Sequence, residues 1–598
     1  MAVDRESLPE RYEDWRESVG AVLAKSRGGD APDDPVGTLT ARTEDGIAVS
    51  PLYTALDEVP EAPLPGTFPF RRGTDALRDV RQGWKVTERF APDEAEGVIG
   101  ALESGASALW LSGDPSAALR GVLLDLAPVW LGAGDAAADS ARALYAALDG
   151  AERIDPEGVH VNLGAAPLTS AVVGRSDVDL DEAVGLAKAA AERPEDVRAI
   201  VVDGADLHNA GATAAQELGL AAAAGLDYLR ALEKAGLTIP EALSQLAFRF
   251  GVTDDQFLGI AKFRAWRTVW ARVAGRLGHP AEGAAPVHAV LSLAATTQRD
   301  PWVNMLRATV AAFGAGVGGA DYVTTLPFDS ALAAGAPGYS AAFSRRIARN
   351  TQLLLLEESN LGRVLDPGAG SWHVEALTDD LARAAWQVLQ DIEGAGGLAA
   401  ACADGTVSRL LSEASAKRDD AVARRKVEIT GVNEFPNLAE APVAGGPAEN
   451  GAVIRSYAAP FEALRARSDI FLEEHGVRPR VWLVTIGTVA QHNGRSTFVT
   501  NLLGSGGIEA VADRAEAATG SARVDGSPGE VVAVLAGSDA GYAEEGEAAA
   551  AAARSGGADR VLLAGAAGTL PEGSVDGCLH TKIDAVAELG DLLNRLGA

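Results

Sequence analysis

Residues 203–232 (DGADLHNAGATAAQELGLAAAAGLDYLRAL) contain the polar side chains best placed for chemistry. They follow the apolar run AIVVDG, which predicts a buried strand, and parallel barrels carry their active sites at the carboxyl ends of such strands. Asp206, His208 and Asn209 are therefore candidate acid–base groups. A structural interpretation competes with this one. In it Asp206 and Asn209 satisfy the start of a helix and His208 is a partly exposed packing residue. The residue pattern favours the structural interpretation.

The other short motifs point away from several common chemistries. Gly314, Gly316 and Gly319 form a Gly-x-Gly-x-x-Gly pattern, but a helical stretch precedes it and a strand follows, which reverses the order that a dinucleotide site needs. The sequence has no P-loop pattern, and none of its eight histidines forms a metal-ligand pair such as His-Glu-x-x-His. Two cysteines, Cys402 and Cys578, make neither a disulfide framework nor a metal cluster and suit a reducing cytosol.

The composition limits the kinds of partner. The 598 residues include 83 Asp and Glu against 52 Lys and Arg, a formal net charge of -31, which argues against nucleic-acid binding. An anionic acyl-CoA would need a local cluster of basic side chains. The N-terminal residues lack the apolar core of an export signal, and no apolar run approaches the ~20 residues of a membrane span. We therefore expect a soluble cytoplasmic protein with neither nucleic-acid nor membrane partners.

Apolar runs alternating with Ala- and Leu-rich helical stretches predict a parallel sheet between about residues 84 and 330. The eight candidate strands are GWKVTERF from Gly83, ALWLSG from Ala108, VWLGAG from Val129, VHVNLGAAPL from Val159, AIVVDG from Ala199, LAFRFGVT from Leu246, VHAVLSL from Val287 and DYVTTLP from Asp321. Eight units favour a closed barrel over an open sheet, because closure removes the sheet edges.

Residues 344–425 are expected to be helical, and a Pro-, Ala- and Gly-rich linker covers 433–452. A second α/β unit follows, with strands from Val481, Val531 and Arg560 and a helix near Ser496. Strands that end in glycine loops before helices predict an open five-stranded doubly wound sheet. The expected organisation is an N-terminal helical arm over 1–50, a barrel domain over 51–400, a helical and linker region over 401–477, and a smaller α/β domain over 478–598.

Several segments resemble methylmalonyl-CoA mutases. The closest are AGATAAQELGLAAAAGLDYLR, SRRIARNTQLLLLEESNLGRVLDPGAGSWHVEALT, DIEGAGGLAAACADG and PLYTALDEVP with LPGTFPFRRG. The likeness is specific over roughly 50–400 and weaker but collinear over 478–598. It implies a (β/α)8 TIM barrel with a substrate channel along its axis, followed by a flavodoxin-like domain of the cobalamin-binding type. The family holds adenosylcobalamin between the two and interconverts succinyl-CoA and methylmalonyl-CoA by radical migration.

The chain departs from the family's catalytic motifs in the barrel. Where catalytic subunits have Gly-Tyr-His before Met-Gln-Glu-Ala-Gly-Ala-Thr, this sequence has Gly204-Ala205-Asp206. The aromatic ring and the imidazole that donates to the thioester carbonyl are thus replaced by a methyl group and an anion, which would oppose charge growing on that carbonyl. The family's Thr-Met-Tyr stretch is replaced by a segment around Asp79 without tyrosine. Arg175 is the nearest candidate for the family's carboxylate-binding arginine, and nothing around it matches.

The cobalamin motif Asp-x-His-x-x-Gly also differs in this sequence. The matching stretch reads Ala490-Gln491-His492-Asn493-Gly494-Arg495. His492 remains as a vestigial candidate for the lower cobalt ligand, but Ala490 cannot accept its proton and Arg495 occupies the place of a small residue. Cobalt ligation by His492 is one interpretation, and a solvent-facing loop histidine is the favoured one.

The resemblance, with these departures, implies a small subunit of a heterodimeric methylmalonyl-CoA mutase. We expect no catalytic, cofactor-binding or metal-binding residues in this chain. Adenosylcobalamin is expected on the large, catalytic partner subunit. Two alternatives stay open: a self-sufficient acyl-CoA mutase with an altered substrate, and a regulatory protein that binds mutases. The favoured hypothesis places Ala205, Asp206 and Asp79 at the barrel mouth and a filled cleft above Ala490.

Overall fold

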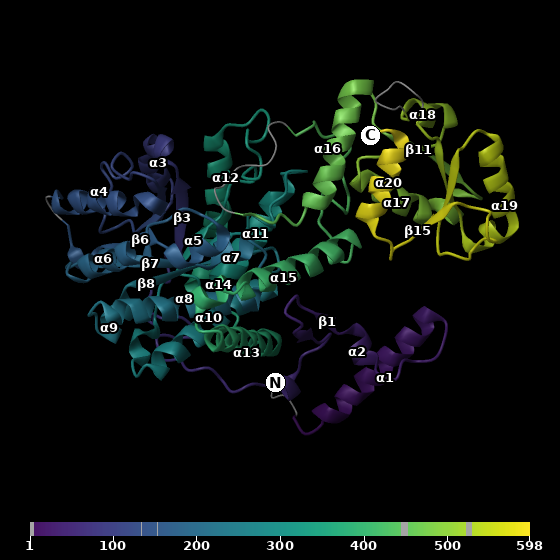
Figure 1. Cartoon of the computed structure of the whole chain (residues 1–598). Helices are drawn as coiled ribbons and strands as arrows, with labels where there is room; N and C mark the ends of the chain where they lie inside the picture. The colour runs from purple at the N-terminus through teal and green to yellow at the C-terminus, as the bar shows by residue number, and fades with distance from the viewer. Residues whose placement is uncertain (1–4, 133, 152–153, 444–452, 522–528) are drawn as a thin grey trace.

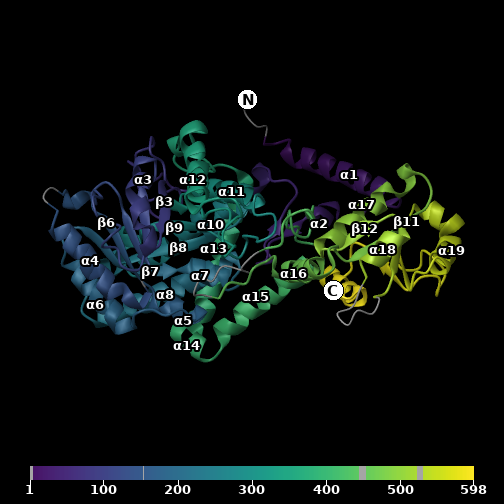
Figure 2. The same cartoon turned by 90° about the horizontal axis from the view of Figure 1, so that it is seen from above.

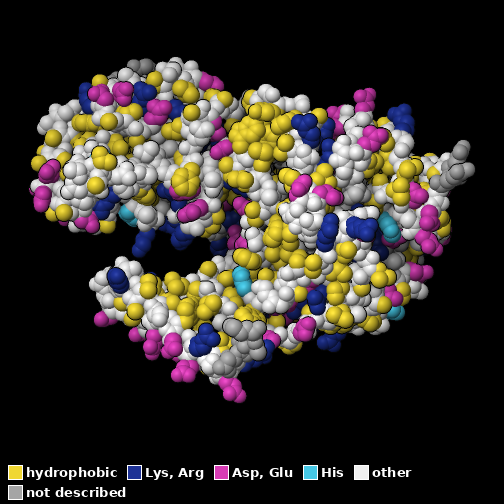
Figure 3. Space-filling model, turned by 180° about the vertical axis from the view of Figure 1, so that it is seen from behind, with side chains coloured by type: hydrophobic (Ala, Val, Ile, Leu, Met, Phe, Trp, Pro, Cys, Tyr) yellow, Lys and Arg dark blue, Asp and Glu magenta, His cyan; other side chains and the backbone are white. Residues whose placement is uncertain are grey.

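The computed structural model describes residues 5–132, 134–151, 154–443, 453–521 and 529–598. It begins with an arm made of α1 (Leu8–Arg27), α2 (Pro35–Leu39) and a two-stranded antiparallel hairpin, β1 (Ala41–Arg42) with β2 (Ala48–Val49). Figure 1 shows α1 and α2 standing away from the rest of the chain. The space-filling view in Figure 3 shows a deep hollow between this arm and the lobe formed by the C-terminal residues.

Eight parallel strands close into a barrel in the order β10-β3-β4-β5-β6-β7-β8-β9. The strands are β3 (Lys85–Phe90), β4 (Ala108–Ser112), β5 (Val129–Gly132), β6 (His160–Ala165), β7 (Asp196–Asp203), β8 (Leu246–Val252), β9 (Val287–Leu291) and β10 (Tyr322–Thr324). Every apolar run expected to be a strand is one, which confirms the (β/α)8 barrel. The strands are apolar because helices cover their outer face and side chains fill the interior; all seven residues of β8 are buried.

Helices surround the barrel. They are α3 (Val98–Glu103), α4 (Ala137–Asp149), α5 (Pro167–Val173), α6 (Leu180–Ala191), α7 (Gly204–Asn209), α8 (Ala214–Lys234), α9 (Ile239–Ser244), α10 (Gln256–Arg276), α11 (Val303–Val317), α12 (Ala341–Leu353) and α13 (Trp372–Gly394). The α8 helix begins at Thr213, whose hydroxyl accepts from the Gln216 N–H in a capping box. Gly219 lets α8 approach α13, because a Cβ there would lie 2.5 Å from Cβ of Val388.

Short helical turns complete the barrel region. The 3₁₀ turns are η1 (Ala55–Asp57), η2 (Pro92–Gly97), η3 (Gly134–Ala136), η4 (Pro156–Gly158), η5 (Pro280–Gly283) and η7 (Leu361–Arg363), and η6 (Leu354–Glu358) is a π-helical turn. The glycine pattern at 314–319 lies at the end of α11 and before β10, so a helix precedes it and a strand follows, as expected. A Cβ on Gly316 would lie 2.3 Å from the ring of Trp84. This glycine therefore serves helix packing.

Three helices, α14 (Leu398–Ala403), α15 (Thr406–Ala423) and α16 (Ala459–His475), lead to the C-terminal domain. That domain contains β11 (Arg480–Thr485), α17 (Val489–Ser505), β12 (Glu509–Val511), α18 (Arg514–Thr519), β13 (Val532–Ala536), α19 (Asp539–Ser555), β14 (Arg560–Ala564), β15 (Gly577–Leu579) and α20 (Ala585–Leu596). Its open parallel sheet has the order β12-β11-β13-β14-β15, which confirms the flavodoxin-like fold. The edge strands β12 and β15 carry no clear apolar run and were not individually expected.

Helix α16 lies between the barrel and the C-terminal domain (Figures 1 and 2). The carboxylate of Glu462 accepts hydrogen bonds from the backbone N–H groups of Gln298 and Arg299, in the loop after β9. Just before α16, the Tyr457 N–H donates to the Ala294 carbonyl at 2.9 Å. These bonds seat the C-terminal domain at the mouth of the barrel. No helix within the described ranges is long and apolar enough to cross a bilayer.

Candidate functional site

Aromatic rings and an imidazole fill the barrel axis. The ring centroid of Trp130 lies 4.9 Å from His288 and 5.2 Å from Tyr322, and Trp110 lies 5.5 Å from His288. These residues come from β4, β5, β9 and β10, so they meet across the barrel. His288 is fully buried, and its Nε2 shares a hydrogen bond of 2.8 Å with the Thr324 hydroxyl. The axial channel implied by the family resemblance is thus occupied at this level by the chain's own side chains.

A cluster of charges lies above this layer, at the carboxyl ends of β7 and β8. Asp203 caps α7 by accepting from the Asp206 N–H, and it also accepts a 2.8 Å hydrogen bond from Arg249. Asp206 lies 3.1 Å from the guanidinium of Arg175, which also donates to the Ser170 hydroxyl. Arg175, the nearest match to the family's carboxylate-binding arginine, is therefore neutralised within the chain. Asp203 is the helix cap that the structural interpretation assigned to Asp206 and Asn209.

Burial raises the pKa of Asp206 to about 7, and the nearby charge of Asp203 acts in the same direction while Arg175 opposes it. Ala205, beside it, is buried and offers only a methyl group. Ala205 and Asp206 thus lie at the barrel mouth, as expected from the sequence. In place of an aromatic ring and an imidazole donor, this position holds an aliphatic side chain and an internally paired carboxyl group.

His208 is buried, with 6% of its surface exposed, which corrects the expectation of a partly exposed residue. Its Nε2 lies 2.7 Å from the Ser292 hydroxyl and its Nδ1 lies 3.4 Å from Glu217. Burial lowers the pKa of His208, although Glu217 opposes this effect. The Asn209 side chain accepts from the Ala294 N–H. Asp206, His208 and Asn209 therefore have separate partners and do not form one acid–base group.

The expected position of Asp79 is wrong. Asp79 lies in the turn that leads into β3 and its side chain accepts from the Arg81 N–H at 2.9 Å. The residues before a barrel strand lie at its amino end, opposite the mouth where Asp206 is found. The segment around Asp79, which replaces the family's Thr-Met-Tyr stretch, therefore does not face the charge cluster.

In the C-terminal domain, His492 lies in the first turns of α17 and not in a loop. It is partly buried, and its Nδ1 lies 3.0 Å from the hydroxyl of Ser496, one turn later in the same helix. Ala490 is exposed at the same helix start. Within the described part of the chain, His492 forms no ion pair with a carboxylate that would orient it as a metal ligand.

Helix α17 has the side chain of Arg495 on one side and a groove on the other. Arg495 donates to the Gly537 carbonyl at 2.6 Å, pairs with Asp539 and stacks 4.7 Å from the ring centroid of Tyr542. It therefore covers the side toward β13. On the other side, a groove of about 910 Å³ extends along α17 between Phe498 and the segment at His580. Neither Ala490 nor His492 lines this groove, so a filled cleft above Ala490 stays a prediction.

Comparison with known proteins places the chain in a family. A sequence model described as methylmalonyl-CoA mutase matches residues 116–472, which is more than half of the chain. The chain belongs to the methylmalonyl-CoA mutase family. The matched residues run from the barrel strands through most of α16, so they include the charge cluster at the barrel mouth.

Relatives within the mutase family match almost the entire length. The chain is 50% identical to a probable methylmalonyl-CoA mutase small subunit of Mycobacterium tuberculosis H37Rv, over 98% of this chain and 97% of the relative. It is 45% identical to the methylmalonyl-CoA mutase small subunit of Streptomyces virginiae, with the same coverage. Identity to that of Propionibacterium freudenreichii subsp. shermanii is 34%, over 98% of this chain and 94% of the relative. The name small subunit implies a larger partner for those proteins.

Two groups at this mutase barrel were not identified from the sequence. Trp110 and Trp130 lie in largely buried strands, and an apolar run does not reveal which residues point inward. Arg89 is the last residue but one of β3, and its Cζ lies 4.8 Å from the ring centroid of Trp110. The strand also contains Lys85 and Glu88, so the sequence did not distinguish Arg89 from its charged neighbours.

Proposed function

We propose that the chain is the non-catalytic small subunit of a heterodimeric, adenosylcobalamin-dependent methylmalonyl-CoA mutase in the cytoplasm. In this proposal the large subunit holds the cofactor and the acyl-CoA and performs the interconversion of succinyl-CoA and methylmalonyl-CoA. This chain contributes a rigid barrel and C-terminal domain as the pseudo-symmetric partner. The names and near-complete coverage of the relatives support the assignment as a small subunit.

The single observation that carries the non-catalytic role is the pairing of Asp206 with Arg175. A thioester carbonyl that gains negative charge needs a hydrogen-bond donor, and a carboxylate at that position destabilises the developing charge. At the same time, the guanidinium that would hold a substrate carboxylate is already neutralised. The substrate machinery suggested by the family motifs is therefore satisfied internally.

The barrel axis and the C-terminal domain give independent support. Trp130 has no exposed surface and packs against His288 and Tyr322, so an acyl-CoA arm passing along the axis would have to displace a buried tryptophan. His492 interacts with Ser496 instead of an orienting carboxylate. These residues do not fit a base-on cobalamin, and we assign no reaction step to the cofactor on this chain.

Co-expression with the large subunit tests the proposal. We expect the two chains to elute together on size exclusion at a one-to-one ratio in high salt, because permanent interfaces bury large apolar areas. Corrin absorbance and mutase activity should follow the complex and be absent from this chain alone. A coloured and active chain without its partner would favour a self-sufficient mutase. A complex that dissociates on the column would favour a regulatory protein.

A further inference from the structure

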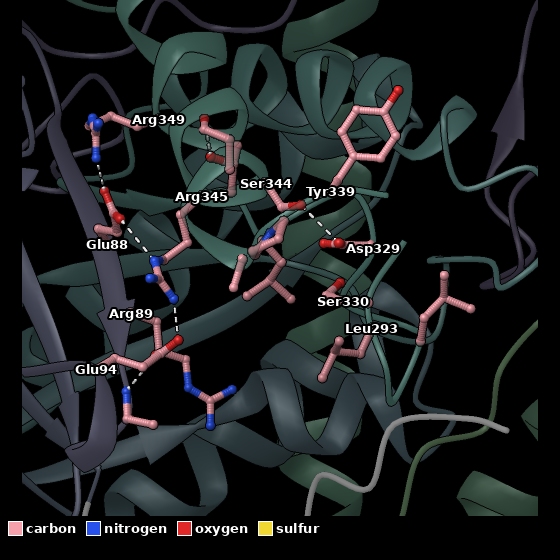
Figure 4. A pocket seen from close by; sticks show the side chains of 18 of the residues that line it. Glu88, Arg89, Glu94, Leu293, Asp329, Ser330, Tyr339, Ser344, Arg345 and Arg349 are labelled. Carbon is pink, nitrogen blue, oxygen red and sulfur yellow. Dashed lines mark hydrogen bonds and ion pairs between the residues drawn. The ribbon is translucent and has the colours of Figure 1, made fainter. Parts of the chain in front are cut away.

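A cavity of about 470 Å³ opens beside the barrel mouth, between the carboxyl ends of β3 and β10 and the helix α12. Figure 4 shows it from close by, with side chains from α12 on one side and from β3 on the other. Part of its lining is apolar and comes from Leu293, Leu326 and Leu332. The volume is within the range of small-molecule sites.

Three arginines line this cavity, and two of them are paired. Arg349 donates to Glu88 at 2.7 Å, and Arg345 forms ion pairs with Glu88 and Glu94. Arg89 differs from them. In the part of the chain that the structure describes, its guanidinium has neither a hydrogen bond nor an ion pair, and no dashed line reaches it in Figure 4. It is the cation at this cavity that remains available to a ligand.

A second positive charge, that of Arg249, lies beside Arg89. Arg89 and Arg249 share the ring of Trp110, at 4.8 and 4.2 Å from its centroid. Burial lowers the pKa of Arg89, the charge of Arg249 adds to this effect, and Asp206 and Glu94 oppose it. The Arg89 side chain is nevertheless exposed at the cavity, so its guanidinium can be reached by a ligand. An oxyanion entering the cavity would pair with this cation.

We propose that this cavity binds a small organic carboxylate, whose oxygens accept hydrogen bonds from Arg89 and whose apolar body lies against Leu293, Leu326 and Leu332. The guanidinium presents a planar pair of donors that matches a carboxylate. The leucines favour a ligand with a short hydrocarbon part over a bare inorganic anion. The site is separate from the proposed structural role, so either idea can fail without the other.

The test is calorimetric titration of the full-length chain with sodium hexanoate, sodium acetate and inorganic phosphate. We expect saturable one-to-one binding of hexanoate and at least about tenfold weaker binding of acetate, because each buried methylene contributes roughly 0.8 kcal/mol. Arg89→Gln should weaken hexanoate binding at least about tenfold, since hydrogen bonds to a charged group are among the strong ones. Arg89→Lys should retain part of the affinity.

Two further variants make the result decisive. Arg346→Gln is the matched control, because Arg346 lies on the same helix α12 but does not line the cavity. Its affinity for hexanoate should equal that of the parent chain. Ala333→Trp adds a large side chain to the cavity lining, leaves Arg89 in place in the sequence, and should also abolish binding. No saturable binding of hexanoate, equal binding of phosphate, or unchanged affinity in both Arg89→Gln and Ala333→Trp would overturn the proposal.

Discussion

Oδ2 of Asp206 lies 3.1 Å from a guanidinium nitrogen of Arg175. The two residues follow neighbouring barrel strands, β7 and β6, and they neutralise each other at the place where the family's catalytic motifs are expected. Because Asp203 and Asp177 also lie within 4.0 Å of Arg175, the arginine is surrounded by acids of its own chain. The charged groups at the barrel mouth are thus neutralised by residues of the chain itself.

The first prediction concerns pH. The pKa of Asp206 is raised from its ordinary value of 3.8 to about 7 in the folded chain. Stability from its protonated form is complete below about pH 4 and is lost as pH rises to about 7, by at most about 1.4 kcal/mol per pH unit. Asp206→Asn should remove this loss. Melting temperatures at pH 5 and pH 8 should therefore differ less in Asp206→Asn than in the parent chain.

The exposed carboxylate of Asp93 provides the control for that experiment. Asp93→Asn should follow the parent curve at both pH values. If Asp206→Asn also follows the parent curve, the pKa of Asp206 is not raised in the folded chain.

The second prediction concerns the aromatic filling of the barrel. Trp130→Ala should lower the free energy of unfolding by about 3–5 kcal/mol, because it leaves a cavity among His288 and Tyr322. Trp302→Ala is the comparison, since 40% of Trp302 is exposed and its loss should cost far less. Urea unfolding monitored by circular dichroism measures both. Equal losses in the two variants would contradict a packed axis.

The third prediction restores the cobalamin pattern. Ala490→Asp combined with Arg495→Gly supplies an acceptor for His492 and removes the guanidinium that crosses to Gly537. We expect hydroxocobalamin to bind this double variant with at least about tenfold higher affinity than the parent, measured by visible absorbance after dialysis. Each single substitution should have a smaller effect. Equal affinity in all four chains would mean that these residues do not limit corrin binding.

The fourth prediction concerns the contact between the two domains. Glu462→Ala leaves the buried N–H groups of Gln298 and Arg299 without their acceptor and should cost about 2–3 kcal/mol. Calorimetry should then show the C-terminal domain melting before the barrel. Glu473→Ala removes an exposed carboxylate from the same helix, α16, and should leave a single transition unchanged. If the melting curve of Glu462→Ala is the same as that of Glu473→Ala, Glu462 does not hold the domains together.

The barrel could be predicted from the sequence because its strands are apolar runs between helical stretches, and their number selected a closed sheet. The edge strands β12 and β15 could not, because each has only three residues and β12 is only half-buried. The position of Asp79 was wrong because a motif missing from a sequence does not say at which end of the barrel its replacement lies.

Side-chain partners were the least predictable part of the candidate site. The carboxylate of Asp206 and the imidazole of His208 are two residues apart, yet one faces Arg175 and the other faces Ser292. A short helix turns consecutive residues to different sides, and the residues that meet them come from other strands. Arg89 was overlooked for a related reason: its lack of a partner is a property of the folded barrel.

The most direct test of the central claim is reconstitution of the isolated full-length chain with adenosylcobalamin, followed by desalting and visible spectroscopy, beside the same treatment of its complex with the large subunit. We predict no corrin on the isolated chain and one corrin per complex. Stoichiometric corrin on the isolated chain together with turnover of methylmalonyl-CoA would contradict the account.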